Sequence, residues 1–391
     1  MNDDLRAWWW VRQGLDGSLA RASPAEALER TGWCRSVGGA GPYLSIFART
    51  GASRERIDAD AKALQLHELP SARGCTYVVP ASDFGIALRA SQGGGDDATI
   101  AMARKFLGVT DKEIDKLSRD IVDAVSKKPL DPRELKDALG ERVRNLGAEG
   151  KKRGTTTTLP LALGKLQTAG AIRRVPVNGR LDQQRYAYIA WKPAPKTDFS
   201  EEQLAIELAR RFFRWAGPAT QAQFSWWSGL GARVAKAAIE KLKLAAVEHG
   251  FLLPEDKTGF EKFRAPERPQ YALVASLDNI SHLRRAVAEL LDAKHAKLEV
   301  YTEKKMENVS SVHDLPHHAI LDRGRLIGFW EYDTEKAKIV WAALEKAPAK
   351  LHDAIERTEA FVRDQLGDAR SFSLDSPESR GPRIAALKKL A

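Results

Sequence analysis

The order of apolar patterns between residues 110 and 190 limits the fold more than any other feature of this sequence. The stretch TDKEIDKLSRDIVDAVSKK repeats apolar residues at helical spacing. In DPRELKDALG, an aspartate before a proline and a glutamate three residues after that aspartate predict a helix start. A third helical stretch, TTLPLALGKLQTAG, ends at Gly170, and AIRRVPVNGRLDQQRYAYIAW then alternates as a β-hairpin around Asn178-Gly179. Three helices and a hairpin are the order of a winged helix, a helix-turn-helix variant whose third helix can enter a DNA groove.

A similar order recurs on both sides of this segment. From residue 200, SEEQLAIELARRFFRWAG and PATQAQFSWWSGL predict two helices, and ARVAKAAIEKLKLAAVEHGFLLPE predicts a basic helix that leads into a shorter wing. The N-terminal region, with DLRAWWWVRQGL, a capped helix at Ser23 and the strand GCTYVVP, predicts a third unit with additions. After about residue 268 the period changes to two, which predicts strands and a hairpin near Arg323-Gly324.

These changes of pattern predict an α+β fold: three tandem winged-helix modules, then a β-rich domain and a C-terminal helix. The expected segments are winged helix 1 with decorations over 1–108, winged helix 2 over 109–195, winged helix 3 over 196–266, the β-rich domain over 267–345, and the C-terminal helix with a basic tail over 346–391. A chain of 391 residues has room for that number of modules.

Composition excludes several classes of protein. The sequence lacks the run of about 18 apolar residues that a membrane-spanning helix needs, and MNDDLRAWWW has no basic region ahead of its apolar run. We therefore expect no membrane partner and a cytoplasmic, nucleoid-associated location. Because the only cysteines are Cys34 and Cys75, a disulfide framework and a multi-cysteine zinc site are excluded.

The charge of the chain is concentrated in one segment. The net charge is +10, which favours a polyanionic partner. Between residues 151 and 185 eight basic residues accompany one acid, Asp182; the basic residues are Lys151, Lys152, Arg153, Lys165, Arg173, Arg174, Arg180 and Arg185. We predict that the first seven bind DNA, because lysine and arginine supply most phosphate contacts. A solvated basic face is the alternative.

Several short motifs occur in the order in which a known family carries them. They are Arg12-Gln13-Gly14-Leu15, PYLSIFAR, the Asp83 region after TYVVP, GPATQAQFSWWSGL, LDNISH and RGRLIGFWEY. In these motifs the chain resembles the winged-helix family of AlkZ-like and YcaQ-like alkylpurine DNA glycosylases, DNA-repair enzymes that unhook interstrand crosslinks. The resemblance implies three winged helices curled around a duplex DNA partner, including duplexes that are alkylated or crosslinked.

The resemblance also places LDNISH near the DNA channel. Asn279 and His282 in this motif are candidates for contacts to phosphates or base edges. A turn that is satisfied by polar side chains is an equally good interpretation.

The stretch that matches the family's catalytic motif departs from it. The glycosylases carry Gln-x-Gln or Gln-x-Asp after a glycine and an apolar residue, whereas Gly32-Trp33-Cys34-Arg35-Ser36 stands here. A glycosylase of this family must hold a water molecule and stabilise an oxocarbenium-like sugar during base release. A carboxamide or carboxylate side chain can do both through lone pairs held in a fixed position. Cys34 and Ser36 are therefore the candidate catalytic positions, and Arg35 would repel the developing positive charge.

Two classes of function remain open from the sequence. The first is a duplex DNA-binding protein without glycosylase chemistry. The alternative is an active DNA glycosylase that excises alkylated purines or unhooks crosslinks with a changed polar set, such as Ser36 with a residue from another module. A third interpretation is a winged-helix protein that binds only other proteins. This interpretation does not explain the basic segment.

No cofactor and no metal are expected. The histidines and the aspartate near residue 315 do not follow a known metal-binding spacing, and Pro316 breaks any helix that would align them; they are His313, Asp314, His317 and His318.

Two further features have structural interpretations. Gln221-Ala222-Gln223 is a literal Gln-x-Gln, but Thr220 and Gln223 have the spacing of a capping box, which predicts a helix start. The tryptophans at positions 8 to 10 cannot all face one side of a helix, because neighbours point about 100° apart. Packing in the core is favoured for them, and one exposed ring that stacks on DNA bases is the alternative.

Overall fold

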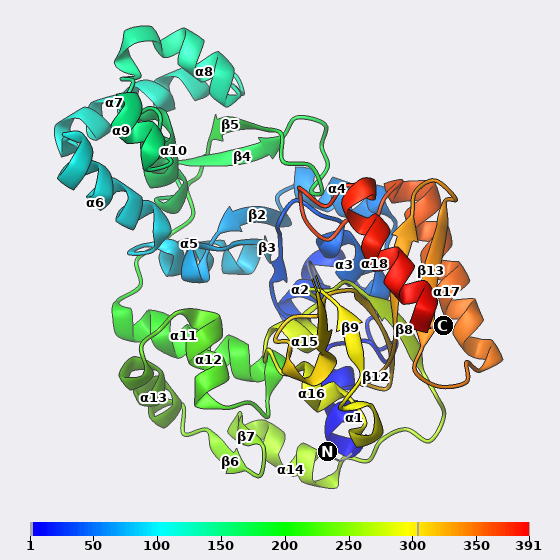
Figure 1. Cartoon of the computed structure of the whole chain (residues 1–391). Helices are drawn as coiled ribbons and strands as arrows, with labels where there is room; N and C mark the ends of the chain where they lie inside the picture. The colour runs from blue at the N-terminus through cyan, green and yellow to red at the C-terminus, as the bar shows by residue number, and fades with distance from the viewer. Residues whose placement is uncertain (1–2, 303–304, 391) are drawn as a thin grey trace.

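The computed structural model describes residues 3–302 and 305–390. Figure 1 shows that the first and last parts of the chain pack together, while the elements between about residues 95 and 260 form two lobes on the other side. The chain is a mixture of helices and antiparallel sheets, as the α+β prediction requires.

The N-terminal unit is built around a three-stranded antiparallel sheet. Its strands are β1 (Cys34–Arg35), β2 (Leu66–Pro70) and β3 (Thr76–Pro80), in the order β1-β3-β2. Its helices are α1 (Asp3–Arg12), α2 (Pro24–Thr31), α3 (Gly41–Thr50), α4 (Arg54–Lys62), α5 (Phe84–Ser91) and α6 (Gly95–Leu107). The predicted cap of α2 is present, because Ser23 accepts a hydrogen bond from the backbone of Glu26.

The second unit consists of helices followed by a hairpin. Its elements are α7 (Asp111–Val125), α8 (Pro132–Leu139), α9 (Gly147–Lys152), α10 (Leu159–Thr168), β4 (Ile172–Pro176) and β5 (Tyr186–Ala190). The capping box of Asp131 and Glu134 opens α8, as predicted. The predicted hairpin is present and the chain turns at Asn178-Gly179, where the backbone of Gly179 donates to the carbonyl of Pro176, but residues 177–185 make the connection longer than a two-residue turn. The loop is held by the N-terminal unit, since the backbone of Leu181 donates to the Tyr43 hydroxyl at 2.9 Å.

The third unit repeats the order of helices and hairpin. Its elements are α11 (Glu201–Ala216), α12 (Gln221–Ser228), α13 (Ala232–Lys241), β6 (Ala245–Val247), β7 (Gly250–Leu252) and α14 (Lys257–Lys262). Thr220 and Gln223 form the capping box that opens α12, so the literal Gln-x-Gln is a helix start, as expected. Asp83 ties this unit to the first, because it accepts hydrogen bonds from Trp33 at 2.8 Å and from Arg211 at 2.8 and 2.9 Å.

The C-terminal part contains the β-rich region. The four-stranded sheet has the order β13-β12-β11-β8, from β8 (Tyr271–Val274), β11 (His318–Asp322), β12 (Arg325–Asp333) and β13 (Lys338–Ala343). Two short strands, β9 (Glu299–Tyr301) and β10 (Met306–Asn308), and two short helices, α15 (Asn279–His282) and α16 (Val287–Leu290), lie beside it. The predicted hairpin at Arg323-Gly324 joins β11 to β12.

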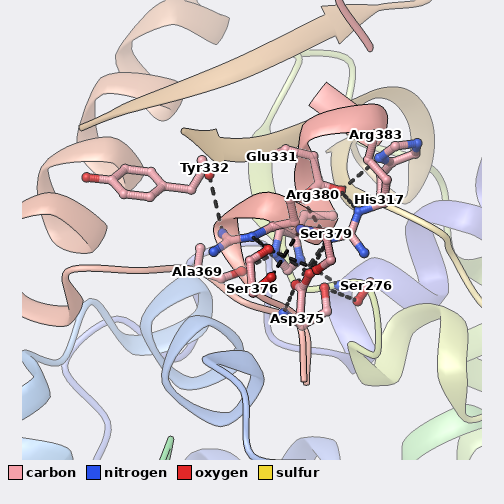
Figure 2. Close-up of polar contacts among 12 residues, drawn as sticks. Ser276, His317, Glu331, Tyr332, Ala369, Asp375, Ser376, Ser379, Arg380 and Arg383 are labelled. Carbon is pink, nitrogen blue, oxygen red and sulfur yellow. Dashed lines mark hydrogen bonds and ion pairs between the residues drawn. The ribbon is translucent and has the colours of Figure 1, made fainter. Parts of the chain in front are cut away.

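The chain ends in helices. α17 (Ala349–Phe361) was expected, but residues 377–390, expected as a basic tail, form α18 (Pro377–Leu390). Two of its arginines are buried: Arg380 contacts Asp368 at 2.7 Å, and Arg383 contacts Asp375 at 2.8 Å. Figure 2 shows these arginines against Asp375 and Glu331. The basic segment is therefore helical, and two of its arginines are neutralised inside the fold, while Lys388 and Lys389 stay exposed.

The consecutive tryptophans of α1 all lie in the core. Trp8, Trp9 and Trp10 are 8%, 1% and 0% exposed, so the alternative of an exposed ring is wrong. The indole of Trp8 donates to the carbonyl of Gly217 and that of Trp9 to the carbonyl of Pro218. Because these carbonyls follow α11, α1 joins the third unit to the rest of the protein.

Candidate functional site

Cys34, the first candidate catalytic position, lies in the core of the N-terminal unit. Its side chain is 6% exposed and lies near the buried ion pair of Arg49 and Asp278, whose side chains contact at 2.8 and 2.9 Å. Burial raises the pKa of the Cys34 thiol to about 12, although the charge of Arg49 acts in the opposite direction. The thiol is therefore protonated at neutral pH, and a protonated thiol is a poor nucleophile.

Arg35 lies on the opposite face of the sheet from Cys34 and Ser36, because successive side chains of a strand alternate. Its guanidinium donates to the carbonyl of Thr76 at 2.9 Å and lies 5.5 Å from the centre of the Tyr77 ring. The positive charge at position 35 therefore points away from the side chain of Ser36.

Ser36, the second candidate position, is hydrogen-bonded to an acid that the sequence analysis missed. The Ser36 hydroxyl donates to Glu68 Oε1, and the two side chains are buried, with Ser36 3% and Glu68 4% exposed. The other carboxylate oxygen, Oε2 of Glu68, is also buried and has no hydrogen bond of ordinary geometry among the described residues, although the Tyr186 hydroxyl interacts with the carboxylate. The single acid in LHELP is the signal in the sequence that could have pointed to this contact. An acid on a strand of a small buried sheet needs a hydrogen-bond or ion-pair partner.

Glu68 lines a cavity of about 590 Å³ between the N-terminal unit and the hairpin of the second unit. The polar side chains that line it come from α4, β2 and the β4–β5 hairpin; they include Glu55, Asp58, Glu68, Arg173, Arg174 and Tyr186. Burial, and next the neighbouring Glu68 carboxylate, raise the pKa of Tyr186, so its hydroxyl remains protonated.

His67, beside Glu68 on β2, also lines the cavity. Burial lowers its pKa to about 3, and the positive charges of Arg173 and Arg174 act in the same direction. The imidazole is therefore neutral at physiological pH.

The seven basic residues predicted to bind DNA have three kinds of environment. Lys151, Lys152 and Arg153 are exposed at the end of α9. Lys165 and Arg180 are engaged in ion pairs, with Asp115 and Asp182 respectively. Arg180 also donates to the carbonyl of Leu366 at 2.9 Å, so it anchors the loop after β4.

Arg173 and Arg174 line the cavity rather than an open wing surface. Arg174 donates to Gln167 Oε1 at 2.6 Å and lies 5.1 Å from the centre of the Tyr186 ring. The structure therefore does not gather the seven residues into one surface.

The two units differ in which helix they expose. α10, the third main helix of the second unit, is buried along most of its length, because α5, α6 and α7 pack against it. It cannot enter a DNA groove without separating from them. α13 of the third unit instead exposes its basic face, with Arg233 and Lys236 exposed and Val234 39% exposed. This helix was predicted to be basic, but its exposed residues were not among the predicted DNA-binding residues.

Asn279 and His282 are buried on α15, at 4% and 5% exposure. The Asn279 side chain donates to the carbonyl of Thr31 at 3.1 Å, and His282 Nδ1 lies 2.8 Å from Asp314. Asp278 caps the helix by accepting from the backbone of Ile280. A turn satisfied by polar side chains, the second interpretation, describes this segment, and neither candidate faces an open surface.

The other histidines near this segment make structural contacts. His317 Nδ1 lies 2.8 Å from Glu331, and His318 Nε2 lies 2.7 Å from the carbonyl of Ala369. Across residues 3–302 and 305–390, no group of three or more His, Cys, Asp or Glu side chains is placed to hold a metal ion. In the same residues every helix is too short or too polar to cross a lipid bilayer.

Comparison with known proteins gives a family and a fold. A family model described as "DNA glycosylase AlkZ-like" matches residues 36–368, which is well over half of the chain and begins at Ser36. The structure of the Streptomyces sahachiroi DNA glycosylase AlkZ is similar, with a TM-score of 0.68 at 18% identity over 95% of this chain and 98% of that one. No curated protein matches the sequence. By the match to its family model, the chain belongs to the AlkZ-like family of DNA glycosylases.

Proposed function

We propose that this protein binds duplex DNA, including duplexes that carry alkylated or crosslinked purines, through three tandem winged-helix modules. The order of elements supports this assignment. In the second unit α7, α8 and α10 precede the β4–β5 hairpin, and in the third unit α11, α12 and α13 precede the β6–β7 hairpin. In the N-terminal unit α2, α3 and α4 precede β2 and β3, and β1 completes the sheet.

The exposed basic face of α13 is the observation that carries the proposal. In a helix-turn-helix protein the second helix of the motif lies in the major groove, and α13 follows α12 after the short turn Gly229–Gly231. Arg233 and Lys236 are suited to phosphates or guanine edges, and the exposed Val234 is suited to a thymine methyl group. The exposed Lys151, Lys152 and Arg153 of the second unit supply a further phosphate-binding surface.

We also propose that the Gly32–Ser36 stretch lacks the standard catalytic pair of the family. Cys34 is buried beside an ion pair as a protonated thiol, and the Ser36 hydroxyl is committed to Glu68. Neither side chain by itself offers the fixed lone pairs that hold water against a sugar cation.

Excision of alkylated purines is a second candidate function, favoured by one contact. The hydrogen bond between Ser36 and Glu68 brings a carboxylate to a position that matches the family's catalytic motif. The protein would then be a DNA N-glycosylase with a changed polar set.

The proposal is tested by the salt dependence of DNA affinity. Fluorescence anisotropy with a labelled duplex should show affinity that falls about 100-fold between about 50 and 200 mM salt, since several phosphate contacts release counterions. A protein that uses the modules only to bind other proteins would show no measurable affinity for the duplex at low salt, and that result would overturn the proposal.

A further inference from the structure

We propose that Glu68 is the catalytic carboxylate of a glycosylase site built on β2, at which the Ser36 hydroxyl orients Glu68 toward a cationic alkylpurine nucleotide. This inference rests on the proposed binding of duplex DNA. It adds the catalytic residue and the pocket to the excision of alkylated purines named there as the second candidate function.

The register of the sheet brings Glu68 to the candidate motif. Cys34, Val78 and Glu68 are opposite one another on β1, β3 and β2. Residues opposite one another point to the same face of a sheet, and Ser36 shares that face because it lies two residues beyond Cys34. The hydroxyl of Ser36 can therefore reach the carboxylate of Glu68 across the strand between them.

The hydrogen bonding of Glu68 is incomplete. Oε1 accepts from Ser36 and the carboxylate interacts with the Tyr186 hydroxyl, while the buried Oε2 has no hydrogen bond of ordinary geometry in the described part of the chain. A buried oxygen without a well-formed hydrogen bond is unfavourable. A water molecule or a ligand group at Oε2 would remove this cost.

The cavity beside Glu68 can hold a ligand of nucleotide size. Its volume of about 590 Å³ lies inside the range of roughly 300–1,000 Å³ found for small-molecule sites. Enzymes that act on a base in duplex DNA turn the nucleotide out of the stack into such a pocket.

The charges of the cavity suit a cationic base on an anionic backbone. Arg173 and Arg174 on one wall can pair with phosphates that flank the extruded nucleotide. Glu55 on α4 supplies negative charge to a purine that carries a positive one, whereas the neighbouring Asp58 is already paired with Arg54 and Tyr43.

The reaction is hydrolysis of the N-glycosidic bond. The bond between C1′ and the purine nitrogen breaks, and its electron pair leaves with the base, which becomes neutral without a proton transfer. Water bonds to C1′ and gives one proton to Glu68, which later releases it to solvent. The carboxylate also stabilises the oxocarbenium-like sugar, so one group serves both steps.

The test is single-turnover base release from duplexes that carry N7-methylguanine or N3-methyladenine. Glu68→Gln keeps the shape of the side chain and an oxygen that accepts from the Ser36 hydroxyl, but it removes the carboxylate that acts as the general base. We expect release of the purine to slow by about 100-fold or more. Glu26→Gln is the matched control, because it removes an exposed carboxylate from α2 of the same unit, outside the cavity, and should leave release nearly unchanged.

Ser36 acts as a positioning residue, which the same assay can separate from a structural role. We expect Ser36→Ala to slow release by about tenfold and the double variant with Glu68→Gln to be no slower than Glu68→Gln alone, since the two residues act as one unit. Anisotropy on an undamaged duplex should give the same affinity for all variants.

The outcomes separate the inference from the proposed function. Absent DNA binding by the unaltered protein would overturn the proposed function itself. Normal binding without release from either lesion, or release that Glu68→Gln leaves unchanged, would overturn the assignment of Glu68 and leave DNA binding standing. If Glu68→Gln unfolds at the same temperature as the unaltered protein, a loss of base release comes from the missing carboxylate and not from instability.

Discussion

Ser36, directly after β1, and Glu68, on β2, form a hydrogen bond in the interior of the N-terminal unit, from the serine hydroxyl to a carboxylate oxygen. Residue 36 by itself carries a weak polar group, and its partner is 32 positions away in the sequence. The antiparallel pairing of β1 and β2 with β3 brings the two together. Position 36 therefore belongs to a pair whose second member is an acid.

We expect Cys34 to be inert to thiol reagents in the folded protein. Its pKa of about 12 and its burial keep both the thiolate fraction and access low. The Cys75→Ala variant, in which Cys34 is the remaining thiol, should give no fast reaction with a disulfide reagent at about pH 8 but one equivalent after denaturation. Fast labelling of the native variant would contradict the described position of Cys34.

We expect Gly32→Ala to destabilise the protein by about 2 kcal/mol. Gly32 has a φ of 105°, and a Cβ atom there would lie 2.9 Å from Asn279 Nδ2 and 3.1 Å from the Trp215 ring. Gly51→Ala is the matched control, because Gly51 also has a positive φ, 70°, but open space around its Cβ position. Equal loss in both variants, measured by urea unfolding, would show that the contacts at Gly32 add nothing to the backbone strain.

We expect stability to fall in acid as two buried carboxylates become protonated. Burial acts to raise the pKa of Asp278, but the charge and hydrogen bonds of Arg49 lower it below the ordinary value. Burial acts likewise on Glu331, and the hydrogen bond from His317 with nearby positive charges lowers its pKa. A lowered pKa contributes stability above the unfolded value of about 4, and this stability is lost as the pH falls through the folded value.

Urea unfolding between about pH 7 and pH 3 measures this effect. Asp278→Asn should be less stable at neutral pH, by about 3–5 kcal/mol, because Arg49 loses its buried partner. Its stability should then change less with pH below about 4 than that of the unaltered protein. Parallel pH profiles would show that Asp278 does not contribute to the acid sensitivity.

The sequence predicted those features that local chemistry decides. The capped starts at Ser23, Asp131 and Thr220 and the hairpin at Arg323-Gly324 all follow from residues within a few positions of one another. Capping and turn formation need no distant partner.

The features that sequence reasoning missed depend on distant partners. The segment that forms α18 was predicted as a basic tail, because Arg380 and Arg383 form their ion pairs with acidic side chains only in the folded chain. The burial of α10 depends on its packing against α5, α6 and α7, and the candidate role of Glu68 depends on the register of three strands. The spacing of apolar residues indicates which face of a helix is buried, but it does not show whether other elements cover the remaining faces.

Two pairs of charge reversals, compared in one DNA-binding assay, show whether α13 holds DNA. Arg233→Glu with Lys236→Glu alters the exposed face of α13, and Lys388→Glu with Lys389→Glu makes the same change of charge on the exposed face of α18. We expect the α13 pair to weaken duplex binding by about tenfold or more and to lower the salt slope by about 2, and the α18 pair to have little effect. Equal affinities and salt slopes for the α13 pair and the unaltered protein would contradict the claim that α13 holds DNA.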